Sequence, residues 1–139
     1  MKRLFATQHS VLTDYGLLLM RLWAGLVMFF AHGKGKLVGF SERAESFADP
    51  FGIGAAASLT LVIFAEVVCA VLLALGLATR IVAVPLLINM LVATYLHAVE
   101  WGDPFAGYEL ALFFAVTYAM FISTGPGRYS IDYLIARRR

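Results

Sequence analysis

The chain has 139 residues, of which 61% are hydrophobic and 14% are charged, and its formal net charge is +2. Soluble domains carry about 45–50% apolar and about 25% charged residues, and a domain of this size has too little interior for a larger apolar share. The composition therefore excludes an ordinary soluble protein and indicates an integral membrane protein. The small net charge, without a groove-reading motif, excludes nucleic acid as a partner. The single cysteine, Cys69, excludes an internal disulfide, and no metal site is expected.

Four stretches are long and apolar enough to cross about 30 Å of hydrocarbon. They predict membrane spans over about residues 15–32, 55–77, 81–99 and 108–123. Each is a continuous apolar run, and this excludes the alternating pattern of membrane β-strands. We therefore expect an all-α fold, a four-helix integral membrane bundle that forms a single domain over residues 1–139.

Basic residues are unevenly divided between the two ends of this bundle. One end collects seven of them, and the other end collects three. Because basic residues accumulate on the cytoplasmic side, both termini are predicted to be cytoplasmic. The seven are Lys2, Arg3, Arg80, Arg128, Arg137, Arg138 and Arg139.

Two oppositely charged residues fall well inside the predicted spans, away from their ends. Arg21 lies about seven residues into the first span, and Glu66 lies near the middle of the second. A charge inside the bilayer costs about 2.5–3.5 kcal/mol even on the lenient insertion scale. We expect the two side chains to form a salt bridge, with neighbouring groups satisfying the remaining guanidinium donors.

A second polar group is expected near the opposite membrane boundary, where His32, His97 and Glu109 lie at similar depth. Asn89 shares a helix face with His97. Four readings compete: polar contacts that fix helix register, a quinone site, a haem held by the two histidines, and a proton or solute pathway along Glu66 and Asn89. A quinone needs an apolar slot, donors at its carbonyls and a proton relay, and these residues offer the last two.

An ordered set of short motifs from about Leu18 to Asp132 resembles the DoxX family. The motifs are Leu18-Leu19-Met20-Arg21-Leu22, His32-Gly33-x-x-Lys36-Leu37, Glu66 followed by Leu75-Gly76-Leu77-Ala78-Thr79-Arg80, Tyr108-Glu109-Leu110, and Gly125-Pro126-Gly127-Arg128-Tyr129-Ser130-Ile131-Asp132. The resemblance implies a four-helix inner-membrane protein of a prokaryotic cell. The family is named for a membrane subunit of a quinone-reducing oxidoreductase, and the resemblance also implies association with membrane oxidoreductases and with oxidative or thiol stress.

The resemblance also identifies polar positions that match the family's pattern. These are Arg21, Glu66, Arg80, Glu109 and Asp132, and Arg128 belongs with Arg80 and Asp132 to a motif expected at the cytoplasmic end. No catalytic role is assigned to any of them.

We therefore expect the membrane subunit of a quinone-linked redox system, with the Arg21–Glu66 pair shaping a polar interior. His32, His97, Glu109 and Asn89 are the predicted quinone ligands, and haem is the less favoured cofactor. The chain has neither a cysteine cluster nor a nucleotide fingerprint, so electrons require a partner protein or a bound haem, and activity as a lone enzyme is not expected. The alternative is a non-catalytic scaffold that recruits or stabilises an oxidoreductase or a stress-response partner. Besides the lipid bilayer and this partner, further copies of the chain in a homo-oligomer are expected contacts.

Overall fold

The computed structural model describes residues 11–138, and within this range the chain forms helices and turns without any strand. Four continuous helices are long and apolar enough to span a membrane, and this confirms the all-α fold and the four spans. They are Val11–Val38, Ala55–Leu75, Thr79–Glu100 and Phe105–Thr124.

Each of the first three spans contains a π-helical turn. The first is built from α1 (Val11–Val27), η1 (Met28–Gly33) and α2 (Lys34–Val38), the second from α4 (Ala55–Ile63), η2 (Phe64–Cys69) and α5 (Ala70–Leu75), and the third from α6 (Thr79–Tyr95) and η3 (Leu96–Glu100). The remaining helices are α3 (Phe40–Arg43), α7 (Phe105–Thr124) and α8 (Ile131–Arg137). Because π-helical turns are rare and occur frequently at functional sites, these three segments mark where to look for one.

The first span is longer than the sequence predicts. The sequence predicts an end near His32, but the helix continues to Val38. Gly33 explains the continuation, since it packs directly on the second span: a Cβ atom there would lie 2.6 Å from the carbonyl oxygen of Glu66. This contact holds the first span in place for another turn, and α2 therefore begins where a loop was expected.

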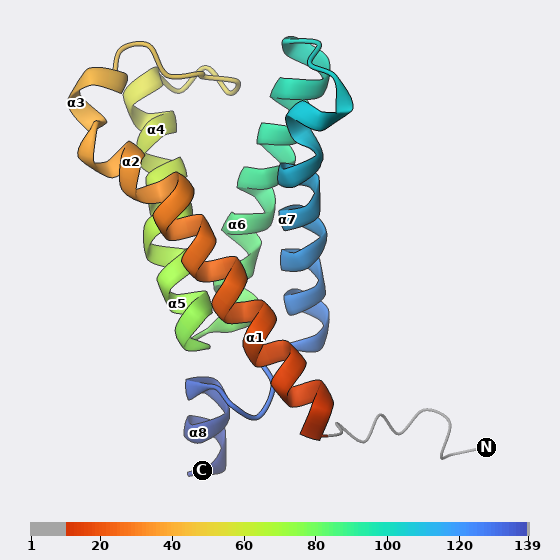
Figure 1. Ribbon diagram of the computed structural model, residues 1–139. Helices are drawn as coiled ribbons and strands as arrows, with labels where there is room; N and C mark the ends of the chain where they lie inside the picture. The colour runs from red at the N-terminus through yellow and green to blue at the C-terminus, as the bar shows by residue number, and fades with distance from the viewer. Residues whose placement is uncertain (1–10, 139) are drawn as a thin grey trace.

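The helices form two pairs. Helices α6 and α7 run side by side, whereas α1 crosses the bundle obliquely and packs against α5 (Figure 1). The crossing is close at Gly25, where a Cβ atom would lie 2.6 Å from the carbonyl oxygen of Ala70. Small residues allow membrane helices to approach in this way. The buried apolar side chains include Met28, Leu73, Leu86, Phe114, Tyr118 and Phe121.

The two ends of the bundle differ. The beginning of α1, the α5–α6 turn and α8 lie at one end, and α3 and the α7 beginning lie at the other (Figure 1). The first end carries Arg80, Arg128, Arg137 and Arg138, and we call it the basic end. Lys2, Arg3 and Arg139, which the sequence also assigns to this end, lie outside the described range.

Candidate functional site

Arg21 is buried, with 2% of its surface exposed, and it binds backbone carbonyls. Its Nε donates to the oxygen of Ala74 at 3.2 Å, Nη1 to Pro126 at 2.6 Å, and Nη2 to Tyr129 at 2.7 Å. The carbonyl of Ala74 lies in the last turn of α5 and has no partner within that helix. Arg21 thus joins α1 to the end of α5 and to the segment that follows α7.

The predicted Arg21–Glu66 salt bridge is therefore wrong. Arg21 binds at the level of Ala74, which is eight residues after Glu66 on the second span. Eight residues correspond to about 12 Å along a helix, so a guanidinium bound at Ala74 does not reach the carboxylate of Glu66. The sequence placed both charges in the bilayer, but the oblique path of α1 determines which part of the second span Arg21 meets.

Asp132 connects α8 to the beginning of α6. Its carboxylate accepts hydrogen bonds from the backbone N–H groups of Ala78 at 2.7 Å and Thr79 at 2.9 Å, and its own N–H donates to Gly76 at 2.9 Å. A carboxylate at this place satisfies donors that every helix N-terminus leaves free. Gly76 is required in the turn, because its φ is 70° and a Cβ atom would lie 2.8 Å from the Arg21 guanidinium.

The two arginines of the predicted end motif lie beside the same segment. Arg128 pairs with Asp14 at 3.5 Å, and its backbone N–H donates to the same carboxylate at 3.1 Å. Arg80 donates from Nη2 to the carbonyl of Ser123 at 3.4 Å. The structure therefore brings Arg80, Arg128 and Asp132 to one end of the bundle. There Asp14 joins the beginning of α1 to the segment after α7, and Asp132 joins α8 to the beginning of α6.

Glu66 is the centre of a different polar group, which we call the Glu66 cluster: Lys36, Glu66 and Asn89. Glu66 lies on η2 and is 3% exposed. Its Oε2 accepts a hydrogen bond from Lys36 Nζ at 2.6 Å, and its Oε1 accepts one from Asn89 Nδ2 at 3.0 Å. The three side chains come from α2, η2 and α6, so the cluster joins three of the four spans.

His32 lies beside this cluster. It precedes Lys36 by four residues, which places both on one helix face, and it directly precedes Gly33, which packs on the backbone of Glu66. The His32 ring also lies near the Phe114 ring, with centroids 6.2 Å apart and the two planes at 84°. His32 therefore lies near both the Glu66 cluster and a buried aromatic side chain.

The local backbone explains why the cluster forms. The π-helical turns η1 and η2 contact each other, and Gly33 allows their backbones to meet at Glu66. The helix then continues into α2, and this brings Lys36 within reach of the carboxylate. Sequence reasoning missed Lys36 because it assigned this residue to a loop. The four-residue spacing of His32 and Lys36 was the signal that could have placed both on one helix face.

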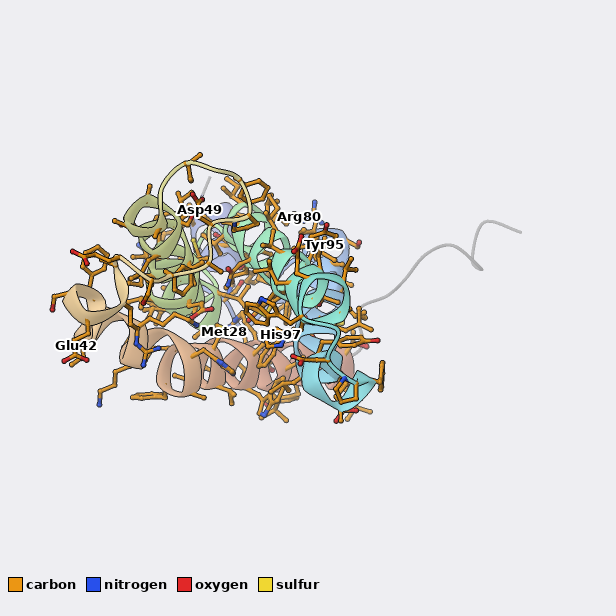
Figure 2. All side chains as sticks on the ribbon, turned by 90° about the horizontal axis from the view of Figure 1, so that it is seen from above. Met28, Glu42, Asp49, Arg80, Tyr95 and His97 are labelled. Carbon is orange, nitrogen blue, oxygen red and sulfur yellow. The ribbon has the colours of Figure 1, made fainter. Side chains whose placement is uncertain are left out.

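His97 and Glu109 do not join this cluster. His97 pairs through Nδ1 with Asp103 at 2.6 Å, and its ring meets Trp101 at 4.5 Å. Seen along the bundle, His97 lies on the α1 side of η3, and Tyr95 lies on the other side (Figure 2). Glu109 is exposed. The four predicted ligand residues are thus divided. Asn89 binds Glu66 and His32 lies near it, whereas His97 binds Asp103 and Glu109 is exposed.

Comparison with known proteins supports the family suggested by the motifs. A family model described as DoxX matches residues 16–99, from α1 to η3. A relative from Mycobacterium tuberculosis (strain ATCC 25618 / H37Rv), the uncharacterized membrane protein Rv3486, is 34% identical over 136 residues, which cover 86% of this chain and 80% of the relative. No solved structure matches. The matched range contains Arg21 and the whole Glu66 cluster.

Proposed function

We propose that this chain, which belongs to the DoxX family of membrane proteins, is the membrane subunit of a redox system and binds a quinone, or a similar amphiphile, at the Glu66 cluster. One observation carries this proposal: a buried carboxylate inside the bundle is held by two side chains, Lys36 and Asn89, from other helices. Ionisable side chains inside the bilayer commonly mark functional pathways, because their burial is costly.

The chemistry of the cluster suits the head group of a quinone. A quinone carbonyl accepts hydrogen bonds, and the Lys36 ammonium and the Asn89 amide each have a donor beyond the one that binds Glu66. A quinol hydroxyl donates, and the Glu66 carboxylate accepts. The same site therefore has partners for the oxidised and the reduced form of the ligand.

Lys36 also links the cluster to the end of the bundle. Its side chain is 20% exposed, whereas that of Glu66 is 4% exposed. A lysine side chain that reaches from a buried carboxylate to the surface provides a route for protons. We therefore assign proton exchange to Lys36 and Glu66, and we assign no ligand contact to His97 or Glu109.

The electrons of such a system come from elsewhere. The chain has one cysteine, Cys69, so it lacks the thiolates that hold an iron–sulfur cluster. We propose that a partner oxidoreductase delivers electrons to the quinone, and that this chain holds the quinone and supplies protons. The redox activity then belongs to the complex.

We further propose that the basic end faces the cytoplasm of a prokaryotic cell, with the protein in the inner membrane. The support is the arrangement of Arg80, Arg128, Arg137 and Arg138 at one end, because basic residues accumulate on the cytoplasmic side. A reporter enzyme that is active only in the cytoplasm, fused after Arg139, should be active. An active periplasmic reporter at the same place would reverse the orientation.

The binding proposal is tested by the quinone content of the full chain purified in mild detergent. We expect close to one quinone per protein, and we expect Lys36→Gln and Asn89→Leu to lower this ratio. His97→Ala and Glu109→Gln serve as controls and should keep the ratio of the unmodified chain. A trace amount that matches the carried-over lipid, and that none of these substitutions changes, would overturn the proposal in favour of the non-catalytic scaffold.

A further inference from the structure

Aromatic side chains join the first span to α7. The most extensive helix contacts of the bundle are those of α6 with α7 and of α1 with α5. Between α1 and α7, the Trp23 ring stacks on Phe114 with ring centroids 5.1 Å apart, and it meets the edge of Phe113 at 5.6 Å. The His32 ring lies near the same Phe114 ring, at 6.2 Å. We call these four side chains, Trp23, His32, Phe113 and Phe114, the aromatic seam.

The π-helical turn η1 explains why two residues of the first span approach one ring. Trp23 and His32 are nine residues apart. In a regular α-helix with about 3.6 residues per turn, this spacing places two side chains on opposite faces. His32 lies in η1, and a π-helical turn contains an additional residue, which changes the face that its side chains occupy. The distortion therefore serves to bring His32 to the α7 side.

An apolar groove opens beside the seam. Its volume is about 460 Å³, and it is lined by Gly16, Leu19, Met20 and Trp23 of α1 and by Phe113 of α7. Leu19 is 66% exposed, and Trp23 and Phe113 are exposed as well, so the groove faces the bilayer. Gly16 leaves it open, because no atom lies within 4 Å of a Cβ atom built there. The volume is within the range of about 300–1,000 Å³ that is usual for small-molecule sites.

Phe114 links the wall of this groove to the Glu66 cluster. The Phe114 ring is buried, and it stacks on Trp23, which lines the groove. It also lies near His32, and the next residue, Gly33, packs on the backbone of Glu66. A rotation of the Phe114 side chain is therefore the local change that would admit a molecule from the groove to the surroundings of the cluster.

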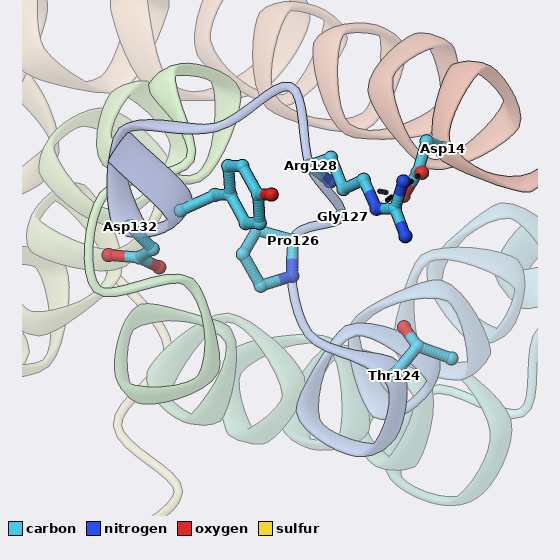
Figure 3. A pocket seen from close by; sticks show the side chains of 7 residues that line it. Asp14, Thr124, Pro126, Gly127, Arg128 and Asp132 are labelled. Atoms are coloured by element: carbon cyan, nitrogen blue, oxygen red, sulfur yellow. Dashed lines mark hydrogen bonds and ion pairs between the residues drawn. The ribbon is translucent and has the colours of Figure 1, made fainter. Parts of the chain in front are cut away.

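The hollow at the basic end has a different character. It has a volume of about 330 Å³, and Asp14, Arg128 and Asp132 are among its lining residues (Figure 3). Arg128 pairs with Asp14 at 3.5 Å, and Asp132 accepts hydrogen bonds from two backbone N–H groups of the α5–α6 turn. These charged side chains stabilise the fold. The groove beside the seam is therefore the hollow that suits an apolar ligand.

We propose that the ligand of the Glu66 cluster carries a hydrocarbon tail and reaches the cluster from the bilayer through the aromatic seam, with its tail in the groove beside Trp23 and Phe113. This inference rests on the proposed function, and it adds the class of the ligand and its route. The tail matches the apolar lining of the groove, and the head group finds its polar partners beyond Phe114. The first span thus contributes to both parts of the site, through the groove and through Lys36.

The first test compares two ligands that share a head group. The probes are a decyl-tailed ubiquinone and the same quinone ring without a tail, each bound to the full chain in the same detergent. Leu19→Trp fills the groove. We expect it to weaken binding of the tailed quinone about fivefold, as is typical for groups in contact, and to leave binding of the tail-free ring unchanged.

Leu61→Trp is the matched control for this variant. It makes the same substitution on α4, at a residue that is 58% exposed, and it should change the binding of neither quinone. If Leu19→Trp fails to fold, Gly16→Leu fills the groove from the open position on α1. Helix content and gel filtration show whether each variant is folded.

The two tryptophans of the chain provide a second readout. Trp101→Phe leaves Trp23 in the wall of the groove, and Trp23→Phe leaves Trp101 beside His97. Bromine on the tail quenches the fluorescence of a tryptophan that it contacts. The additional quenching by a brominated tail, relative to the same quinone without bromine, should be saturable for Trp23 and absent for Trp101. Glu66→Gln should reduce it.

The outcomes separate this inference from the proposed function. Unchanged binding of the tailed quinone in Leu19→Trp, or equal additional quenching of Trp23 and Trp101, would overturn the route and leave the quinone site in place. Equal weakening of both quinones by Leu19→Trp would show general damage, and would also overturn it. A tail effect that Glu66→Gln leaves unchanged would assign the groove to membrane lipid. If neither quinone binds the unmodified chain, the proposed function fails, and this inference fails with it.

Discussion

Two of the buried charged side chains, Arg21 and Glu66, are held by different kinds of partner. Arg21 donates to three backbone carbonyls, whose positions are set by the ends of helices. Glu66 accepts from two side chains, Lys36 and Asn89, which are able to change rotamer. A charge held by the backbone stabilises one arrangement of helices. A charge held by side chains can exchange a partner for a ligand.

The surroundings of the two charges strengthen this difference. Arg21 lies beside the tight turn at Gly76, where neighbouring atoms leave no room for a Cβ atom. Glu66 lies in the π-helical turn η2, which contacts the π-helical turn η1. Such turns interrupt regular α-helical hydrogen bonding and are common at functional sites. We infer that burial of a charge does not by itself identify a ligand site, and that the kind of partner does.

The largest effect is expected from Arg21→Leu. The substitution leaves three carbonyls without their donor, one buried and two partly buried, and loss of a partner costs a buried group about 1–3 kcal/mol. We expect a loss of at least about 3 kcal/mol in the free energy of unfolding, measured by denaturation in detergent. Arg21→Lys should recover less than half of this loss, since an ammonium lacks the planar fork that reaches separate carbonyls. A variant with leucine as stable as the unmodified chain would contradict the structural role of Arg21.

A smaller effect is expected from Asp132→Ala, which removes the acceptor at the beginning of α6. Loss of a side chain that accepts from the first N–H groups of a helix costs about 0.5–2 kcal/mol. Asp132→Asn keeps one acceptor oxygen and should cost less. Both losses are measured by the same unfolding experiment. If the alanine variant showed no loss, the contacts of Asp132 with Ala78 and Thr79 would not stabilise the basic end.

Glu66→Gln should have a modest effect on stability and a large one on ligand binding. A glutamine oxygen still accepts a hydrogen bond from Asn89, and Lys36 can turn towards the surface. We expect a loss of about 1 kcal/mol in the free energy of unfolding. If Glu66→Gln lost as much free energy of unfolding as Arg21→Leu, Glu66 would stabilise the fold as Arg21 does, and the difference between the two charges would be contradicted.

The smallest effect is local and depends on pH. Hydrogen bonds from the Ser58 hydroxyl and from the backbone N–H of Gly54 hold the pKa of Asp49 below its usual range. Because the pKa is lower in the folded state, the stabilisation is present above the unfolded value of about 3.9 and is lost as the pH falls through the folded value. Hydrogen exchange at Ile53 and Gly54 should be slow near neutral pH and faster in Asp49→Asn. Equal exchange in both chains would show that Asp49 does not hold this loop.

The sequence predicts the spans well and the polar contacts only in part. Continuous apolar runs determine where helices cross the bilayer, and the four spans follow from them. The pairing of Arg21 was wrong because sequence spacing gives depth along a helix and not the angle at which helices cross. Asn89 was identified through its helix face and does lie in a polar cluster. Lys36 was missed because the packing of Gly33, which extends the first span, is a tertiary contact.

The motif at the basic end shows the same limit. Its residues were identified by resemblance, and their contacts were not. Asp132 binds a turn that is 53 and 54 residues away in the chain, and Arg128 binds Asp14 at a separation of 114 residues. Local patterns carry no information on pairings of this kind, because these depend on the order in which the helices pack.

We propose that the Glu66 cluster holds the ligand, whereas the polar contacts at the basic end stabilise the fold. The most direct test compares the quinone-to-protein ratio of folded Glu66→Gln with that of folded Asp132→Asn, since both substitutions replace one carboxylate by an amide. We predict that Glu66→Gln loses most of its quinone and that Asp132→Asn retains it. Equal ratios in the two variants would contradict the claim.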